Sequence, residues 1–364
     1  MEKDKLSRRG FVRGAAGLGA ALATCGLAGT AFASDKAADA KAGSASADKV
    51  ASAAKDGVVI DYKGREVAIP EKIERIAVTC MGGATQTVCV FGGADRLVVS
   101  PSMAKSAPLV LKLFPQIEDA VDAGTFDDVN IESLAAADPD FAFVASTSDK
   151  GNAAIEELGI PTYTLGTANS TIESMRNDYI NAGKLLGTSD VADDLMKFWD
   201  DLLGYVAEKL ETIPEEDRLT VYRCGAELTA ASHTPWATTW IEGAGGIPAV
   251  EKDGMTSDVS IEQVAAWDPD VISTSGDVDA ILTNEAYADL KAVKNGAVYK
   301  TPKGTMSWDV PSPEVPLGFA WLAKTLYPET FADLDVEAKC KEFYAQFFNY
   351  DLTGEDLDGI FLRK

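Results

Sequence analysis

The feature that most constrains the fold of this chain is a phrase that occurs twice. IESLAAADPDFAF begins at Ile131 and IEQVAAWDPDVI begins at Ile261, and seven of their aligned positions are identical. Repeat arrays recur every 20–50 residues, whereas these copies start 130 residues apart. A single recurrence at this spacing in a chain of 364 residues predicts two domains of similar build.

Short β-branched runs alternate with helical segments through most of the chain. Predicted strands are 76–79, 97–99, 141–144, 162–165, 219–222, 271–273 and 297–299, and predicted helices are 84–92, 131–137, 152–158, 237–243, 261–267 and 313–326. Alternation of this kind is typical of α/β proteins with parallel sheets covered by helices. We therefore expect two α/β lobes, an N-terminal lobe over residues 57–170 and a C-terminal lobe over residues 212–364.

A long amphipathic helix is predicted between the two lobes. Apolar residues recur at steps of three and four from Ser189 to Leu210, at Val191, Leu195, Phe198, Leu202, Val206 and Leu210. About twenty residues at roughly 1.5 Å each make a rod near 30 Å long, comparable with a small domain. Residues 171–211 are therefore expected to form a rigid link between the lobes, with a ligand cleft between them.

The first 56 residues indicate export. Arg8-Arg9 begins a twin-arginine pattern, and an uncharged Gly/Ala/Leu run follows it and ends in an A-x-A site at Ala33. Residues 1–33 are therefore predicted to be a cleaved signal peptide, and residues 34–56 a low-complexity tether. Cys25 lies in a sequence that resembles a lipobox, so a lipid anchor is the alternative to release outside the cytoplasm.

Both copies of the phrase have the residues that start a helix. Asn130 and Ser260 are good N-caps, and Glu132 and Glu262 follow in the first turn. A carboxylate there complements the helix dipole by at most about 1 kcal/mol. This structural role is the simplest explanation of the two glutamates.

The two copies on either side of a long helix resemble the substrate-binding proteins of ABC importers. The resemblance is to the class with one rigid linking helix, whose members bind iron-siderophores, haem, cobalamin and some metals, and it extends to Ser312-Pro313, Leu317–Lys324 and Phe343–Phe348. In that family one surface glutamate per lobe docks on the two-fold symmetric permease dimer. The resemblance thus implies that Glu132 and Glu262 are the docking residues of a monomeric binding protein.

Candidate ligand-binding residues follow the predicted strands, because ligands of open α/β sheets bind at the carboxyl ends of the strands. Aromatic and thioether groups there suit a flat ligand, Arg223 and Lys105 suit an anionic one, and His233 could ligate iron or cobalt. The alternatives are core packing for the tryptophans, solvated charges for the cations and a loop role for the histidine. The set is Met81, Met103, Lys105, Arg223, His233, Trp236 and Trp308.

Composition excludes several classes of function. A net charge of −24 argues against binding nucleic acid. A single histidine argues against the zinc and manganese branch of the resembled family. Neither G-x-S-x-G nor a P-loop is present, so an enzyme, at most a carboxylate-dependent hydrolase, is a remote alternative. Cys80, Cys89, Cys224 and Cys340 have no C-x-x-C spacing, which disfavours zinc and leaves disulfides open.

The prediction from sequence is therefore a binding subunit without a cofactor or a resident metal. Its expected ligand is an iron complex, either a siderophore or haem. Cobalamin or another corrinoid is the alternative, and an oxyanion is the third candidate.

Overall fold

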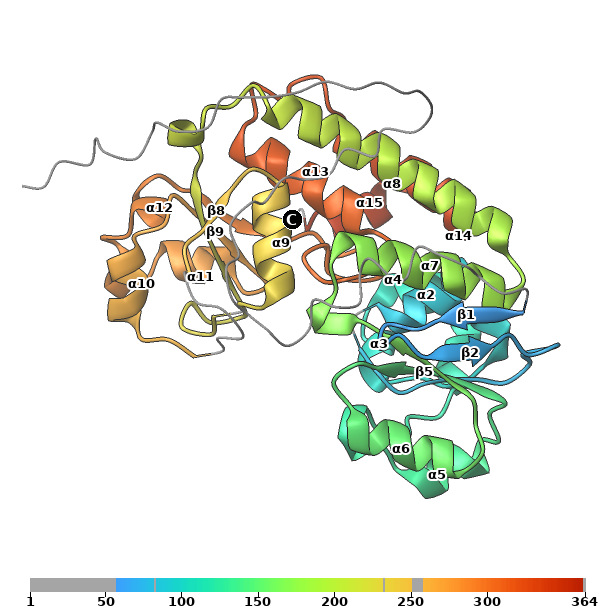
Figure 1. The fold of residues 1–364 in the computed structure, drawn as a ribbon. Coiled ribbons are helices and arrows are strands. Elements are labelled where there is room, and N and C mark those ends of the chain that lie inside the picture. The colour runs from blue at the N-terminus through green and yellow to red at the C-terminus, as the bar shows by residue number, and fades with distance from the viewer. Residues whose placement is uncertain (1–56, 82, 232, 251–257, 363–364) are drawn as a thin grey trace, which may run out of the picture. The chain divides into compact units, whose positions relative to one another are not determined.

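The computed structural model describes residues 57–81, 83–231, 233–250 and 258–362 (Figure 1). The predictions of a signal peptide over 1–33, a tether over 34–56 and a lipid anchor at Cys25 lie outside these residues. Within them the chain forms two parallel four-stranded sheets and a short antiparallel hairpin. The predicted α/β class with two parallel sheets is confirmed.

The N-terminal lobe contains the first of the two sheets, with its strands in the order β4-β3-β5-β6. These strands are β3 (Ile76–Val78), β4 (Leu97–Val99), β5 (Phe141–Ala145) and β6 (Thr162–Leu165). The hairpin consists of β1 (Val58–Ile60) and β2 (Glu66–Ala68). The helices of this lobe are α2 (Ala84–Val90), α3 (Ser102–Lys105), α4 (Pro108–Leu113), α5 (Ile131–Ala136) and α6 (Asp149–Glu157).

The C-terminal lobe repeats this topology, with the order β10-β9-β7-β8. Counted from the first strand of each lobe, both sheets are ordered second, first, third, fourth. The strands are β7 (Thr220–Cys224), β8 (Ile247–Pro248), β9 (Val271–Thr274) and β10 (Val298–Lys300), and the helices are α9 (Pro235–Gly243), α10 (Ile261–Trp267), α11 (Val278–Leu282) and α12 (Lys291–Lys294). The two copies of the repeat thus correspond to two sheets of the same strand order.

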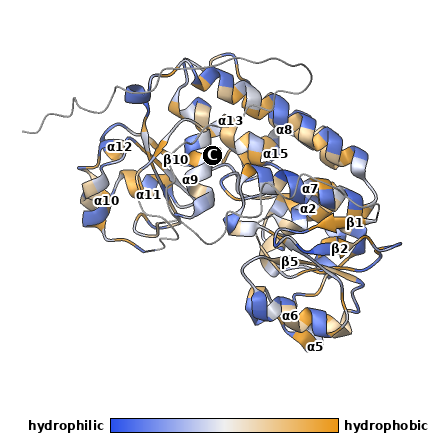
Figure 2. Cartoon of the chain, viewed as in Figure 1, coloured by the Kyte–Doolittle hydropathy of each residue, from blue (hydrophilic) through white to orange (hydrophobic). Residues whose placement is uncertain are grey.

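The predicted linking helix is present with both of its predicted ends. α8 spans Ser189–Leu210 and follows α7 (Ile172–Leu186). Its apolar side is buried against α7 and against α13 (Val315–Leu326) of the C-terminal part, whereas its other residues are hydrophilic (Figure 2). Trp199 adds a specific bond, because its indole Nε1 donates to the carbonyl of Pro313 at 3.1 Å. The domain boundaries at 170 and 211 stay a prediction.

The C-terminal helices make a second connection to the N-terminal lobe. α14 (Val336–Phe348) contacts α2, and α15 (Gly354–Ile360) follows it. The rings of Phe114 and Phe348 meet edge to face at 5.6 Å between centroids. Lys112 Nζ lies 2.6 Å from Asp356 Oδ1. The lobes are thus joined by the C-terminal helices as well as by α8.

The repeated phrase forms the same local structure in both lobes, a short helix followed by the third strand of the sheet. Asn130 Oδ1 caps α5 by accepting from Ser133 N at 2.9 Å, and Ser260 Oγ caps α10 by accepting from Gln263 N at 3.2 Å. An aspartate with left-handed backbone follows each helix, with φ 49° at Asp138, one residue beyond the C-cap of α5, and φ 39° at Asp268, the C-cap of α10.

The second aspartate of each copy ties the third strand to the start of the first. Asp140 accepts from the backbone amides of Glu74 and Arg75 at 2.8 and 3.1 Å, just before β3. Asp270 accepts from the amide of Thr220 at 2.8 Å, where β7 begins. The second aspartate of each copy therefore has a structural function, and Glu132 and Glu262 lie in the first helical turn, where a carboxylate complements the helix dipole.

None of the helices in the described part of the chain combines the length and the apolar character needed to cross a bilayer. The sequence analysis missed the edge strand β8, because it has two residues and one of them is Pro248. It also placed the start of β7 one residue early and its end two residues early.

Candidate functional site

The carboxyl ends of the strands form one edge in each lobe, and a contact between η4 and α9 joins the two lobes there. A single 3₁₀ turn, η4 (Thr167–Asn169), follows β6 in the N-terminal lobe and lies against α9 of the C-terminal lobe. Since ligands of open parallel sheets bind at this edge, the region around η4 and α9 is the candidate site.

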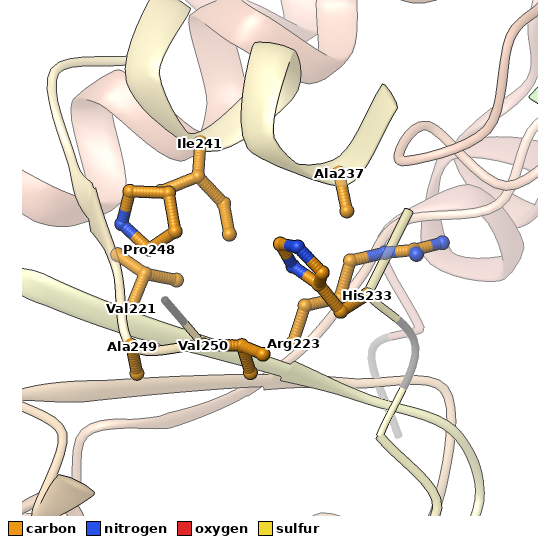
Figure 3. Close-up of a pocket in the computed structure, with 8 residues that line it drawn as sticks. All are labelled: Val221, Arg223, His233, Ala237, Ile241, Pro248, Ala249 and Val250. Atoms are coloured by element: carbon orange, nitrogen blue, oxygen red, sulfur yellow. The ribbon is translucent and has the colours of Figure 1, made fainter. Parts of the chain in front are cut away.

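A small pocket lies beside α9 in the C-terminal lobe (Figure 3). Two of the residues predicted for the site, Arg223 at the end of β7 and His233 before α9, line it together. It encloses about 180 Å³ of space, part of which is open to solvent. The other lining residues are Val221, Ala237, Ile241, Pro248, Ala249 and Val250. Pockets for drug-sized ligands range from about 300 to 1,000 Å³, so this pocket is far smaller than those.

Arg223 is held by a nearly buried ion pair that the sequence analysis missed. Its Nε donates to Asp309 Oδ2 at 2.6 Å, and the two side chains are 10% and 8% exposed. Ser307 Oγ donates to the other carboxylate oxygen of Asp309 at 2.5 Å, and Trp236 Nε1 donates to its backbone carbonyl at 2.9 Å. Asp309 thus organises a site of three other polar side chains. It directly follows Trp308, which was a predicted site residue.

Both tryptophans predicted to contact the ligand are packed inside the protein. Trp236 is 1% exposed and Trp308 is fully buried, and each indole nitrogen donates to a protein acceptor. The ring of Phe319 packs on Trp236 at 6.1 Å and that of Phe361 on Trp308 at 5.4 Å. These contacts favour the core role that the sequence analysis kept as the alternative, while ligand contact stays a prediction.

Trp308 belongs to a buried network around Glu314. The carboxylate oxygens of Glu314 accept from Trp308 Nε1 at 2.9 Å, from the backbone amide of Thr305 at 2.9 Å and from Tyr344 Oη at 3.1 Å. Burial raises the pKa of Glu314, although these hydrogen bonds oppose the shift. The network fixes the loop that carries Asp309 to the site.

The three candidates in the N-terminal lobe do not form a cluster with the pocket residues. Met81 is half-buried and follows β3, while Met103 on α3 is 56% exposed. Lys105 Nζ donates to the carbonyls of Glu118 and Ala120. Its ammonium group therefore closes the turn after α4, and its role with a ligand stays a prediction.

Metal-binding groups are scarce in the described residues, which contain no cluster of three or more His, Cys, Asp or Glu side chains able to hold an ion. Cys80, Cys89, Cys224 and Cys340 are buried free thiols. Burial raises the pKa of the Cys224 thiol to about 11, and it raises the other three further. Thiols in this state are poor nucleophiles and poor metal ligands.

Glu132 and Glu262 are both exposed in the first turn of their helices. A hydrogen bond from Ser260 lowers the pKa of Glu262, so this carboxylate is ionised at neutral pH. Each lobe therefore presents one acidic side chain from an equivalent position.

Comparison with known proteins identifies the family. A periplasmic binding protein family matches residues 78–305, which is more than half of the chain. The chain belongs to this family. The resemblance inferred from the sequence is thereby confirmed, and the relatives are solute-binding proteins of transporters.

Three relatives illustrate the range of the family. The molybdate-binding protein MolA of Haemophilus influenzae is 27% identical over 326 residues, covering 82% of this chain and 92% of MolA. The Fe(3+)-citrate-binding protein YfmC of Bacillus subtilis is 24% identical over 204 residues, covering 54% of this chain and 64% of YfmC. The crystal structure of a periplasmic solute-binding protein from Veillonella parvula superposes with a TM-score of 0.73 at 28% identity, covering 84% of this chain and 96% of the other.

Proposed function

We propose that this protein is the extracytoplasmic binding subunit of an ABC importer and that its cargo is a compact anionic metal species. The observation that carries the proposal is Arg223, which lines a pocket of about 180 Å³ at the strand ends together with His233. A guanidinium group in this position favours oxygen-rich anions. The name of the relative MolA supports a metal oxyanion as the first candidate.

A small ferric complex of a hydroxycarboxylate is the second candidate. It retains the iron complex expected from the sequence, and the name of the relative YfmC supports it. Haem and corrinoids are less well supported, because a flat macrocycle needs an exposed aromatic or apolar surface. Trp236 and Trp308, the predicted aromatic contacts, are buried and bonded to protein acceptors.

The proposed partner is a permease dimer that docks on both lobes. Glu132 and Glu262 are exposed at equivalent positions of the two lobes, in the first turns of α5 and α10. We further propose export by the twin-arginine route, with release or a lipid anchor at Cys25, a monomeric state, and a transport function without catalysis.

The cargo can be identified by metal analysis of the purified protein, followed by calorimetric titration of the apo-protein with candidate ligands. Protein purified from its native host is analysed for metals by mass spectrometry. Apo-protein is then titrated with molybdate, ferric citrate, haemin and cobalamin in a calorimeter. We expect binding of molybdate or ferric citrate, and a weakening of about tenfold or more in Arg223→Met, since a charge-assisted hydrogen bond contributes about 1.5–3 kcal/mol. Tight binding of haemin or cobalamin alone would refute the proposal.

A further inference from the structure

The turn that meets the opposite lobe contains a residue with strained backbone. Thr167 has φ 52°, in the left-handed region. For a β-branched residue this conformation is a genuine outlier that costs free energy. Such strain persists only where the surrounding structure enforces it, and it clusters at functional sites.

Three hydrogen bonds from three different elements enforce the turn. The amide of Gly166 donates to Asp178 Oδ2 of α7 at 3.1 Å, and the carbonyl of Gly166 accepts from Ser146 Oγ at 2.8 Å. Tyr62 Oη donates to the carbonyl of Asn169 at 2.9 Å. The turn is therefore rigid before anything binds to it.

Close packing at Gly166 adds to this rigidity. A Cβ atom at this position would lie 2.7 Å from the ring of Tyr62 and 2.7 Å from Ser170 Oγ. These distances are too short for any side chain, so the backbone of Gly166 lies directly against its neighbours. Thr167 is consequently held in place on its N-terminal side.

The hydroxyl of Thr167 is buried and unpaired. The residue is 6% exposed, and its Oγ1 has no hydrogen-bond partner within the described residues. Buried hydroxyl groups in folded proteins nearly always have a partner, because an unsatisfied one costs about 1–3 kcal/mol. Six buried side-chain N or O atoms of the described residues have no partner, and Thr167 is the one residue among them with a positive φ. It lies in η4, where η4 meets α9, so an acceptor from outside the chain could satisfy its hydroxyl there.

We propose that Thr167 is a cargo-contact residue, whose hydroxyl donates a hydrogen bond to an oxygen atom of the anionic cargo at the junction of η4 and α9. The inference rests on the proposed function and adds to it a specificity-determining residue in the N-terminal lobe. A hydroxyl donor selects for cargo with exposed oxygen atoms, such as a metal oxyanion or a carboxylate complex. A hydroxyl group has no acceptor to donate to on the apolar face of a macrocycle.

The test compares a substitution of Thr167 that keeps the hydroxyl with one that removes it. Thr167→Ser keeps the donor, whereas Thr167→Gly removes the donor and also relieves the positive φ. Asn349→Gly is the matched control, since Asn349 is an exposed residue with φ 48° at the end of α14. Affinity for molybdate and for ferric citrate is measured by calorimetry, and thermal stability by circular dichroism.

We expect Thr167→Gly to bind its cargo about ten to a hundred times more weakly, in line with loss of a hydrogen bond to a charged acceptor. Its melting temperature should be unchanged or higher. Thr167→Ser should bind within a fewfold of wild type, and Asn349→Gly should bind equally well. Equal cargo affinity in Thr167→Gly and wild type would overturn the inference and assign the hydroxyl to a buried water. Failure of wild type to bind either probe would instead refute the proposed cargo class.

Discussion

Asp178 provides a stability test that depends on pH. It lies in α7 with a 4% exposed side chain, and it accepts from Tyr163 Oη at 3.0 Å and from the amide of Gly166 at 3.1 Å. Burial raises the pKa of Asp178 from 3.8 to about 7, assisted by the charge of Asp61, although both hydrogen bonds oppose the shift. The native state therefore keeps a proton on Asp178 at pH values where the unfolded chain has lost it.

The sign of the effect follows from this difference in bound protons. Between pH 3.8 and pH 7 the native state binds one proton more than the unfolded state, so the free energy of unfolding falls as the pH rises. Above pH 7 both states are ionised and this contribution is constant. From pH 5.5 to pH 8 the free energy of unfolding should fall by about 2 kcal/mol, because roughly 1.5 pH units of this range lie below the native pKa of Asp178.

The assay is urea unfolding of wild type and Asp178→Asn at pH 5.5 and pH 8, both above the sequence pI of about 4.4. Asparagine stays neutral and can still accept from Gly166. The variant should therefore gain about 2 kcal/mol relative to wild type on going to pH 8. Asp193→Asn, which removes an exposed charge on α8, controls for net charge. Parallel pH profiles for wild type and Asp178→Asn would show that Asp178 is ionised throughout and refute the argument.

Three further predictions concern docking, the tryptophans and the buried network. Glu132→Lys and Glu262→Lys should each impair uptake by cells, since like charges placed against a partner can cost several kcal/mol. Cargo affinity and the free energy of unfolding should stay near wild type. Normal uptake by the double variant would leave the repeat with its structural role alone. Trp236→Ala and Trp308→Ala should each lower the free energy of unfolding by about 3–5 kcal/mol, and unchanged cargo affinity in both would remove them from the site. Glu314→Ala should lower the free energy of unfolding by about 3 kcal/mol or more and Glu314→Gln by less, because alanine takes the acceptor from the buried donors Thr305 Oγ1, Trp308 Nε1 and Tyr344 Oη. Equal losses in urea unfolding would contradict this account.

The elements predicted best are those whose periodicity and caps agree. α8 and α10 have their predicted bounds, because a regular apolar stripe in the first and a capping serine in the second define them. The repeat also predicted the two similar lobes, whose sheets share one strand order. Strand β8 was not predictable, because its two residues carry no period of their own and pair only through β7.

The site was predicted in part, because its geometry depends on contacts between distant segments. Arg223 and His233 line the same pocket, as their positions after the predicted strand 219–222 and before the predicted helix 237–243 suggested. Asp309 can be recognised as a site residue only in the folded chain, which brings it next to Arg223, 86 residues away in the sequence. Thr167 was missed because nothing in a threonine indicates a left-handed backbone, which here results from bonds to Tyr62, Ser146 and Asp178.

The second connection between the lobes has a consequence for the order in which the chain can fold. α2 of the N-terminal lobe is contacted by α14, and Lys112 pairs with Asp356 of α15. A nascent chain that has reached residue 335 contains all the strands of both sheets, yet it lacks the contact of α14 with α2 and that of Phe348 with Phe114. Helices that are synthesised after both sheets therefore complete the packing of the N-terminal lobe, so this lobe reaches its native packing only after the strands of the C-terminal lobe have been made.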